Sequence, residues 1–304
     1  MGVSAENKDQ AENLRNLVNT GKTAVSKRPA SRVITVTSGK GGVGKSNTAI
    51  NLAIQFKKQG KKVIILDADL GLANIEVMFG TVPKYSLYDM IKNGRDIKEV
   101  ITNGPMDIGF ISGGSGIADM ANLSRRELET IINNLSKLDS MADVLIIDTG
   151  AGISDSVMEF LLSSSEILLV TTPEPASITD SYSLLKALGR NRHFEKNDTT
   201  VWFIGNKVKN EKEGRELFQK LDAVVNRYLE IKINYLGSVP YDPQLEKAVM
   251  QQKPVSIGAP DSKSALAYGA IASFLSGQEA GLGQESRGIT ALFARMLRFG
   301  KKGG

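Results

Sequence analysis

The stretch Gly39-Lys40-Gly41-Gly42-Val43-Gly44-Lys45-Ser46 is the part of the sequence that decides the fold. It fits the phosphate-binding pattern G-x-x-x-x-G-K-[ST]. Residues 32–37 before it form a β-branched run that predicts a strand, and the spacing of residues 46–53 after it predicts a helix. In this strand, loop and helix setting, backbone N–H groups and the helix N-terminus favour a bound phosphate.

The loop also suggests a role for each side chain in it. Lys45 is placed to reach the β and γ phosphates, and the Ser46 hydroxyl is placed to ligate Mg²⁺. A glycine-rich loop of another kind is the alternative, and the flanking strand and helix argue against it. The residues that we expect to contact the nucleotide here are Gly39, Gly41, Gly42, Val43, Gly44, Lys45, Ser46 and Asn47.

Composition limits what the rest of the chain can be. Its 304 residues, 41% hydrophobic and 23% charged, are typical of a soluble globular protein of about one α/β domain with extensions. The absence of cysteine excludes disulfides and iron–sulfur ligation by this chain alone. The sequence contains no run of 18 apolar residues, which is the length that a membrane-spanning helix needs. We therefore expect a cytoplasmic protein.

Strand and helix patterns alternate after residue 32, which favours an α/β fold with a mostly parallel twisted sheet and helices on both faces. The expected strands are residues 33–37, 63–67, 108–112, 144–148, 167–171, 201–206 and 235–239. The expected helices include residues 49–59, 124–138, 177–188, 214–229 and 264–275.

We expect three parts in the chain. Residues 1–31 are a flexible extension with one short helix, which either packs on its own domain or awaits a partner. Residues 32–277 are the nucleotide-binding domain, and residues 278–304 are a linker with a terminal amphipathic helix.

Three aspartates follow predicted strands at the carboxyl edge of the sheet, where ligands bind in such folds. Asp148 closes an apolar strand and is our candidate for ordering the magnesium shell. Asp67 and Asp69 are two residues apart, so an extended backbone points both to one side. One of them can support magnesium, for which we name Asp67, while the other holds the attacking water. For Asp69 and Asp148, capping of the next helix is the simpler alternative.

Base recognition is predicted from two segments. Asn206-Lys207-Val208-Lys209 lacks the aspartate that a guanine reader of the N-K-x-D kind has at its last position, while the Asn206 amide can pair with adenine, which favours ATP over GTP. Residues 239–243, with Pro240 and Asp242, either provide a flat contact to the base or form a plain turn.

Residues 289–299 predict a strongly amphipathic helix. At about 100° per residue, the apolar side chains fall within an arc of roughly 160°, with Arg295 and Arg298 opposite. Such a basic helix suits an anionic membrane surface, and the alternative is packing on the domain or on a partner. The apolar residues are Ile289, Leu292, Phe293, Met296, Leu297 and Phe299.

Besides Lys45, the loop contains a further lysine, Lys40, near its start. This lysine gives the deviant form K-G-G-x-G-K-[ST], which resembles the loop of the MinD/ParA class of P-loop ATPases. Residues 67–74 (DADLGLAN) resemble the first switch of that class. Residues 148–152 (DTGAG) resemble its second switch, with Ala151 where many members have proline. The resemblance covers about residues 32–275.

That resemblance implies Mg²⁺ and ATP as cofactors and a homodimer that sandwiches two ATP molecules. Lys40 would reach the phosphates bound by the partner subunit, and Lys45 would bind phosphate in its own subunit. Ser46 and Asp148 would hold magnesium. Asp69 would position the water. The C-terminal helix resembles the membrane-targeting tail of MinD.

The segment 9–15 (DQAENLR) is similar to the D-Q-A-x-x-L-R activator motif of the FlhG (YlxH) family of MinD-like ATPases, which regulate flagellar number and placement. This second resemblance implies activation of the FlhF GTPase, contact with flagellar C-ring proteins and no specific nucleic acid. A ParA-like ATPase that binds DNA non-specifically is the alternative. The matching motif residues are Asp9, Gln10, Ala11, Leu14 and Arg15.

Overall fold

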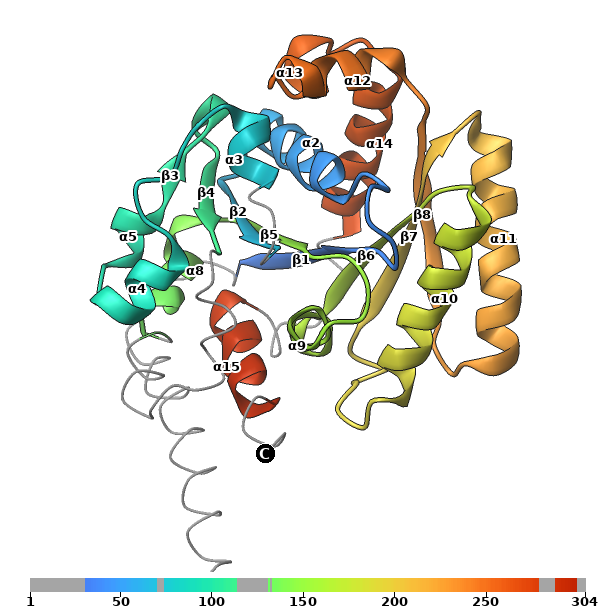
Figure 1. Cartoon of the computed structure of the whole chain (residues 1–304), viewed down its shortest axis with the longest axis horizontal. Coiled ribbons are helices and arrows are strands. Elements are labelled where there is room, and N and C mark those ends of the chain that lie inside the picture. The colour runs from blue at the N-terminus through green and yellow to red at the C-terminus, as the bar shows by residue number, and fades with distance from the viewer. Residues whose placement is uncertain (1–30, 70–73, 114–130, 132, 279–287, 300–304) are drawn as a thin grey trace, which may run out of the picture.

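The computed structural model describes residues 31–69, 74–113, 131, 133–278 and 288–299. One eight-stranded sheet forms its centre, in the order β3-β4-β2-β5-β1-β6-β7-β8 (Figure 1). Every pairing is parallel except that of β3 with β4. The strands are β1 (Arg32–Thr37), β2 (Val63–Ala68), β3 (Thr102–Asn103), β4 (Gly109–Ser112), β5 (Val144–Thr149), β6 (Glu166–Thr171), β7 (Thr200–Val208) and β8 (Ile233–Pro240).

All seven strands predicted from the sequence are confirmed. β2, β5 and β6 are buried along their whole length, as expected for strands covered by helices on both faces. The sequence analysis missed β3, because its two residues are too short for a periodic pattern. The fold is therefore the predicted mostly parallel α/β sheet with one antiparallel edge.

Helices cover both faces of the sheet (Figure 1). One core cluster packs beneath α2, α3, α12, α13 and α14, and two others lie on the opposite face. Several helices were not predicted, because they are short or lie close to loop residues. The helices are α2 (Lys45–Lys58), α3 (Asn74–Phe79), α4 (Leu87–Asn93), α5 (Ile97–Val100), η2 (Pro105–Asp107), α8 (Leu138–Met141), α9 (Asp155–Ser163), α10 (Pro175–Arg190), α11 (Glu211–Tyr228), α12 (Pro243–Met250), α13 (Val255–Gly258), α14 (Lys263–Gly277) and α15 (Ile289–Phe299).

The register of the central strands brings the predicted site residues together. Asp67 of β2 lies opposite Asp148 of β5, and Asp148 lies opposite Val36 of β1, one residue before that strand ends. Because β1, β2 and β5 are parallel, the loop after β1 and both aspartates meet at one edge.

An ion pair secures the other end of the sheet. Arg32 binds both carboxylate oxygens of Glu166, and it also donates to the main-chain oxygen of Leu275 at the end of α14. The indole of Trp202 donates to the same carboxylate. These contacts join β1, β6, β7 and α14, so this end of the sheet is a rigid base for the site.

The C-terminal amphipathic helix is confirmed as α15, and in this structure its apolar face packs on the domain. Ile289, Leu292, Phe293 and Met296 are all buried in the core cluster formed with α8, α9 and the neighbouring strands. Figure 1 shows α15 beside α9 below the sheet. The side chains of Leu297 and Phe299, and residues 1–30, for which the sequence predicts a short helix, lie outside the described residues.

Within the described residues, no helix combines the length and apolar character that crossing a membrane requires.

Candidate functional site

The loop between β1 and α2 is shaped to hold a phosphate. Gly42 and Gly44 adopt φ of 76° and 97°, which side chains with a Cβ rarely tolerate. A Cβ on Gly41 or Gly42 would meet nothing within 4 Å, so the backbone at these positions faces open space. Lys45 begins α2 and is only 7% exposed. The loop thus presents bare backbone and a buried lysine to a ligand.

Two side chains of β7 brace this loop. The Asn206 amide donates to the main-chain oxygen of Val43 at 2.6 Å, and the Lys207 ammonium donates to that of Gly42 at 3.0 Å. A Cβ on Gly44 would lie 2.3 Å from the Asn206 amide nitrogen, so a glycine is required there. The other amide atom of Asn206, Oδ1, is buried and has no hydrogen-bond partner among the described residues. Adenine recognition by Asn206 stays a prediction.

Asp148 has a buried carboxylate that lacks hydrogen-bond partners. Neither of its oxygens has one within the described part of the chain. Burial raises the pKa of Asp148 to about 7, and the neighbouring Ser46 hydroxyl and Lys45 ammonium counter only part of that rise. An unpartnered buried carboxylate beside a serine hydroxyl fits Mg²⁺, which prefers oxygen ligands and takes few from the protein when a nucleotide supplies the rest. When bound, the ion neutralises charge on the phosphates.

Asp67 and Asp69 lie in different surroundings, and the roles predicted for them, magnesium support and water positioning, stay predictions. The carboxylate of Asp67 accepts hydrogen bonds from the backbone N–H groups of Asp69 and Ile75, both at 3.2 Å. Burial raises the pKa of Asp67 to about 6, against these hydrogen bonds, which lower it. Asp67 therefore ties down the start of the first switch. Asp69 is less buried, and its carboxylate oxygen lies 3.6 Å from where a Cβ on Gly150 would be, at the second switch.

The raised pKa values predict a pH dependence of stability for the nucleotide-free chain. A carboxyl whose folded-state pKa is above its unfolded value binds more protons when folded, so the free energy of unfolding falls as pH rises from about 4 to 7. Asp148 alone should contribute a loss of a few kcal/mol across this window. Urea unfolding at pH 5 and pH 8 measures it. Asp148→Asn should flatten the dependence, and an unchanged slope in that variant would contradict the assignment.

Lys40, the lysine near the start of the loop, forms an ion pair with Glu174, with 2.6 Å between its ammonium nitrogen and the carboxylate oxygen. The hydrogen bond from Lys40 lowers the pKa of Glu174. Both side chains are substantially exposed, so solvent screens the pair and Lys40 can leave it readily. The sequence analysis missed Glu174, although it follows β6 at the same sheet edge and the strand-end rule that found Asp148 would also have found it.

Asp242 links α12 and α14 in this structure, and its expected contact with the base stays a prediction. One carboxylate oxygen accepts from the Gln244 N–H at the start of α12, and the other accepts from the N–H and hydroxyl of Ser264 in α14. Burial opposes ionisation, yet these hydrogen bonds leave the pKa of Asp242 below its usual value. Asp242 thus caps α12, a role that the sequence analysis did not consider, while Pro240, the last residue of β8, is paired with Val208.

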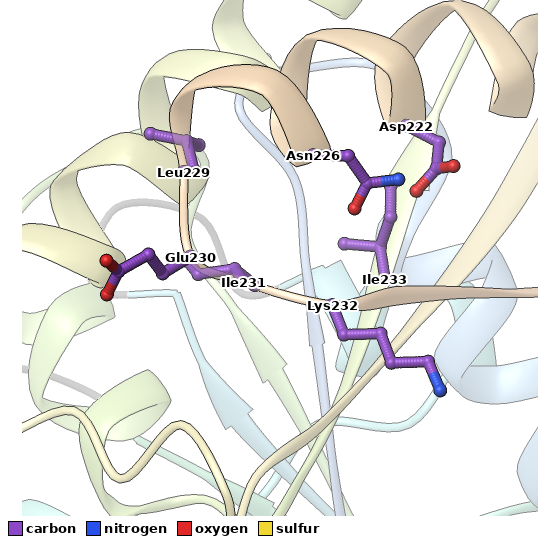
Figure 2. Close-up of a pocket in the computed structure, with 7 residues that line it drawn as sticks. All are labelled: Asp222, Asn226, Leu229, Glu230, Ile231, Lys232 and Ile233. Atoms are coloured by element: carbon purple, nitrogen blue, oxygen red, sulfur yellow. The ribbon is translucent and has the colours of Figure 1, made fainter.

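A hollow at the amino end of β8 lies away from this site. Figure 2 shows its lining between the end of α11 and the start of β8, with Asp222, Glu230 and Lys232 pointing in different directions. Because charged groups that do not converge cannot share a ligand, we assign the chemistry to the carboxyl edge.

The fold and the loop together define a P-loop NTPase. The ParA family model, described as NUBPL iron-transfer P-loop NTPase, matches residues 29–276, and the chain belongs to this family. Members bind ATP with Mg²⁺, and the chain is an ATPase of this MinD/ParA type. Iron transfer is not carried over, because the sequence offers no cysteine ligand.

Individual relatives agree with this family. The chain is 41% identical to the antiactivator FleN of Pseudomonas aeruginosa, covering 79% of this chain and 85% of FleN. It is 33% identical to the flagellum site-determining protein YlxH of Helicobacter pylori, covering 96% of this chain and 99% of YlxH. The solved structure of the cell division ATPase MinD of Pyrococcus furiosus superposes with a TM-score of 0.64 at 23% identity, covering 81% and 99% of the two chains.

Proposed function

We propose that the chain is an ATP-driven dimerisation switch that associates with the membrane and regulates flagellar number or placement. The flagellar part is supported by the names of the relatives FleN and YlxH. The switch part is supported by Lys40, which is exposed enough to exchange Glu174 for a phosphate of a partner subunit. In this scheme ATP closes the dimer, and hydrolysis opens it.

The docked helix α15 is the observation that supports a regulated membrane contact. Its four buried apolar side chains would be the ones to enter a membrane, so the helix cannot serve both surfaces at once. Burying each contributes about 1.5–3 kcal/mol, or roughly 6–12 kcal/mol for the four. Spontaneous release is therefore rare, and a second event must bias it.

The second switch provides a physical route for that bias. Asp148–Gly152 leads directly into α9, whose N-terminus is capped by Ser154, and α9 is the helix against which α15 packs most extensively. A shift of this switch on ATP-dependent dimerisation would move α9 and weaken the site of α15. Membrane insertion then recovers the burial of the helix, with about 1 kcal/mol added by each basic residue.

Sedimentation with vesicles tests the membrane proposal. The full chain should bind vesicles rich in anionic lipid with ATP and much less with ADP, and deletion of residues 285–304 should abolish this binding. Salt-sensitive binding to duplex DNA that survives the deletion would instead favour the ParA-like alternative.

The N-terminal extension gives the flagellar proposal its own test. A peptide of residues 1–30 should stimulate the GTPase activity of FlhF, whereas a peptide with Gln10 and Arg15 replaced by alanine should not. If the unmodified peptide is silent, activation of FlhF through this motif is excluded. Contact with flagellar C-ring proteins is part of the same proposal, and binding assays with those proteins would test it.

A further inference from the structure

The N-terminus of α15 is capped by a residue from a distant helix. The carboxylate of Asp139 in α8 accepts hydrogen bonds from the Ile289 N–H at 2.8 Å, the Thr290 N–H at 3.1 Å and the Thr290 hydroxyl at 2.5 Å. A carboxylate here satisfies N–H groups that the helix leaves unpaired, and it interacts favourably with the positive end of the helix dipole.

The residue directly before α15 cannot supply such a cap with a side chain of its own. The residue before Ile289 is Gly288, which has no side chain to accept a hydrogen bond, and its φ is 114°. The helix has only 11 residues, fewer than an isolated helix needs to be stable in water. The helical state of α15 therefore depends on its surroundings, and Asp139 is the part of those surroundings that stabilises its first turn.

Asp139 is itself held firmly from the other side. The hydroxyl of Ser31 donates to the main-chain oxygens of Asp139 and Ala142, and Ser31 is 1% exposed. The next residue, Arg32, donates its N–H to the main-chain oxygen of Asp143. Ser31 and the start of β1 thus hold the main chain at Asp139 through contacts that do not involve α15.

We propose that Asp139 is the latch that holds α15 on the domain and sets how often the helix is released. The apolar face provides most of the docking energy but no directional contact, whereas the three hydrogen bonds to Asp139 require the helix to start at one place. Breaking them leaves the first turn without its cap, so release proceeds from that end. This inference rests on the proposed function only for the biological use of the released helix.

Hydrogen exchange of the full chain without vesicles tests the latch directly. In Asp139→Asn, amides of residues 289–299 should exchange at least about tenfold faster, because the amide keeps only one of the two acceptor oxygens and loses the negative charge, so that part of the cap is lost. Amides of α14 and β5 should be unchanged, which a general loss of folding would not give. Asp261→Asn is the matched control, since Asp261 is exposed and lies in the turn before α14, which packs on the other face of the sheet from α15.

A variant with a smaller change tests the latch if Asp139→Asn does not fold. Thr290→Val retains the shape of the side chain and removes only the hydroxyl hydrogen bond, so exchange in α15 should rise by about two- to fivefold. Unchanged exchange of α15 in both variants would overturn the proposal.

Vesicle binding separates this proposal from the proposed function. Faster exchange of α15 together with stronger nucleotide-independent vesicle binding supports both. Faster exchange without any vesicle binding supports the latch and contradicts the membrane role. Unchanged exchange contradicts the latch whatever the vesicles show.

Discussion

Replacing Lys40 with alanine should abolish ATP-dependent dimerisation while leaving a folded monomer that still binds ATP. In the single chain the Lys40 ammonium pairs with an exposed glutamate, so loss of this side chain removes little from the fold. Lys45, buried at the start of α2, remains to hold the nucleotide. If Lys40 reaches the phosphates of a partner, its charge acts as an arginine finger does, and ATP turnover should fall roughly 10³-fold or more.

Two measurements and one control decide this prediction. Light scattering after gel filtration, with ATP and with ADP, reports the dimer, and steady-state phosphate release reports turnover. Lys220→Ala removes an exposed lysine from α11 and should change neither. A Lys40→Ala dimer as strong as that of the unaltered chain would show that the contact with Glu174, and not a cross-subunit contact, is the role of this lysine.

Much of the site could be predicted because it follows directly from local patterns. The loop pattern and the strand-end rule locate Lys45 and Asp148, and the parallel register confirms that these elements share one edge. Within the described residues, neither oxygen of the Asp148 carboxylate has a hydrogen-bond partner, which leaves both oxygens available to magnesium. These predictions need only strand order and the direction of the chain.

What escaped prediction depends on contacts between distant residues. Glu174 is 134 residues from Lys40, and Asp139 is 150 residues from Ile289. The strand-end rule could have marked Glu174 as a site residue, but no local pattern shows which residue either carboxylate contacts. The apolar arc of α15 was predicted correctly, but periodicity identifies only which face is apolar and not whether a core or a membrane covers it. Asp242 was ambiguous for a related reason, since an aspartate followed by proline is also a helix start.

Replacing Asp69 with alanine should trap the ATP-bound dimer. Asp69 belongs to the first switch, and its carboxylate lies near Gly150 of the second switch, where it can orient a water molecule and accept its proton. Loss of a positioned base slows such reactions by about 10²–10⁴-fold. ATP binding should persist, because the loop, Lys45 and Asp148 are unaltered. If release of α15 follows dimerisation, the variant should also stay on vesicles after ATP addition, whereas the unaltered chain should dissociate as ATP is consumed.

A contact between Asp69 and Asn74, both in the first switch, supplies the control for this prediction. The Asn74 amide donates to the Asp69 carboxylate at 3.4 Å, so Asp69 could act by holding α3 in place instead of by handling water. Asn74→Ala removes that contact and keeps the carboxylate, and it should retain most of the turnover in a single-turnover assay. If Asn74→Ala is as slow as Asp69→Ala, the carboxylate works through the switch. If Asp69→Ala hydrolyses ATP at the normal rate, the water is positioned by another group.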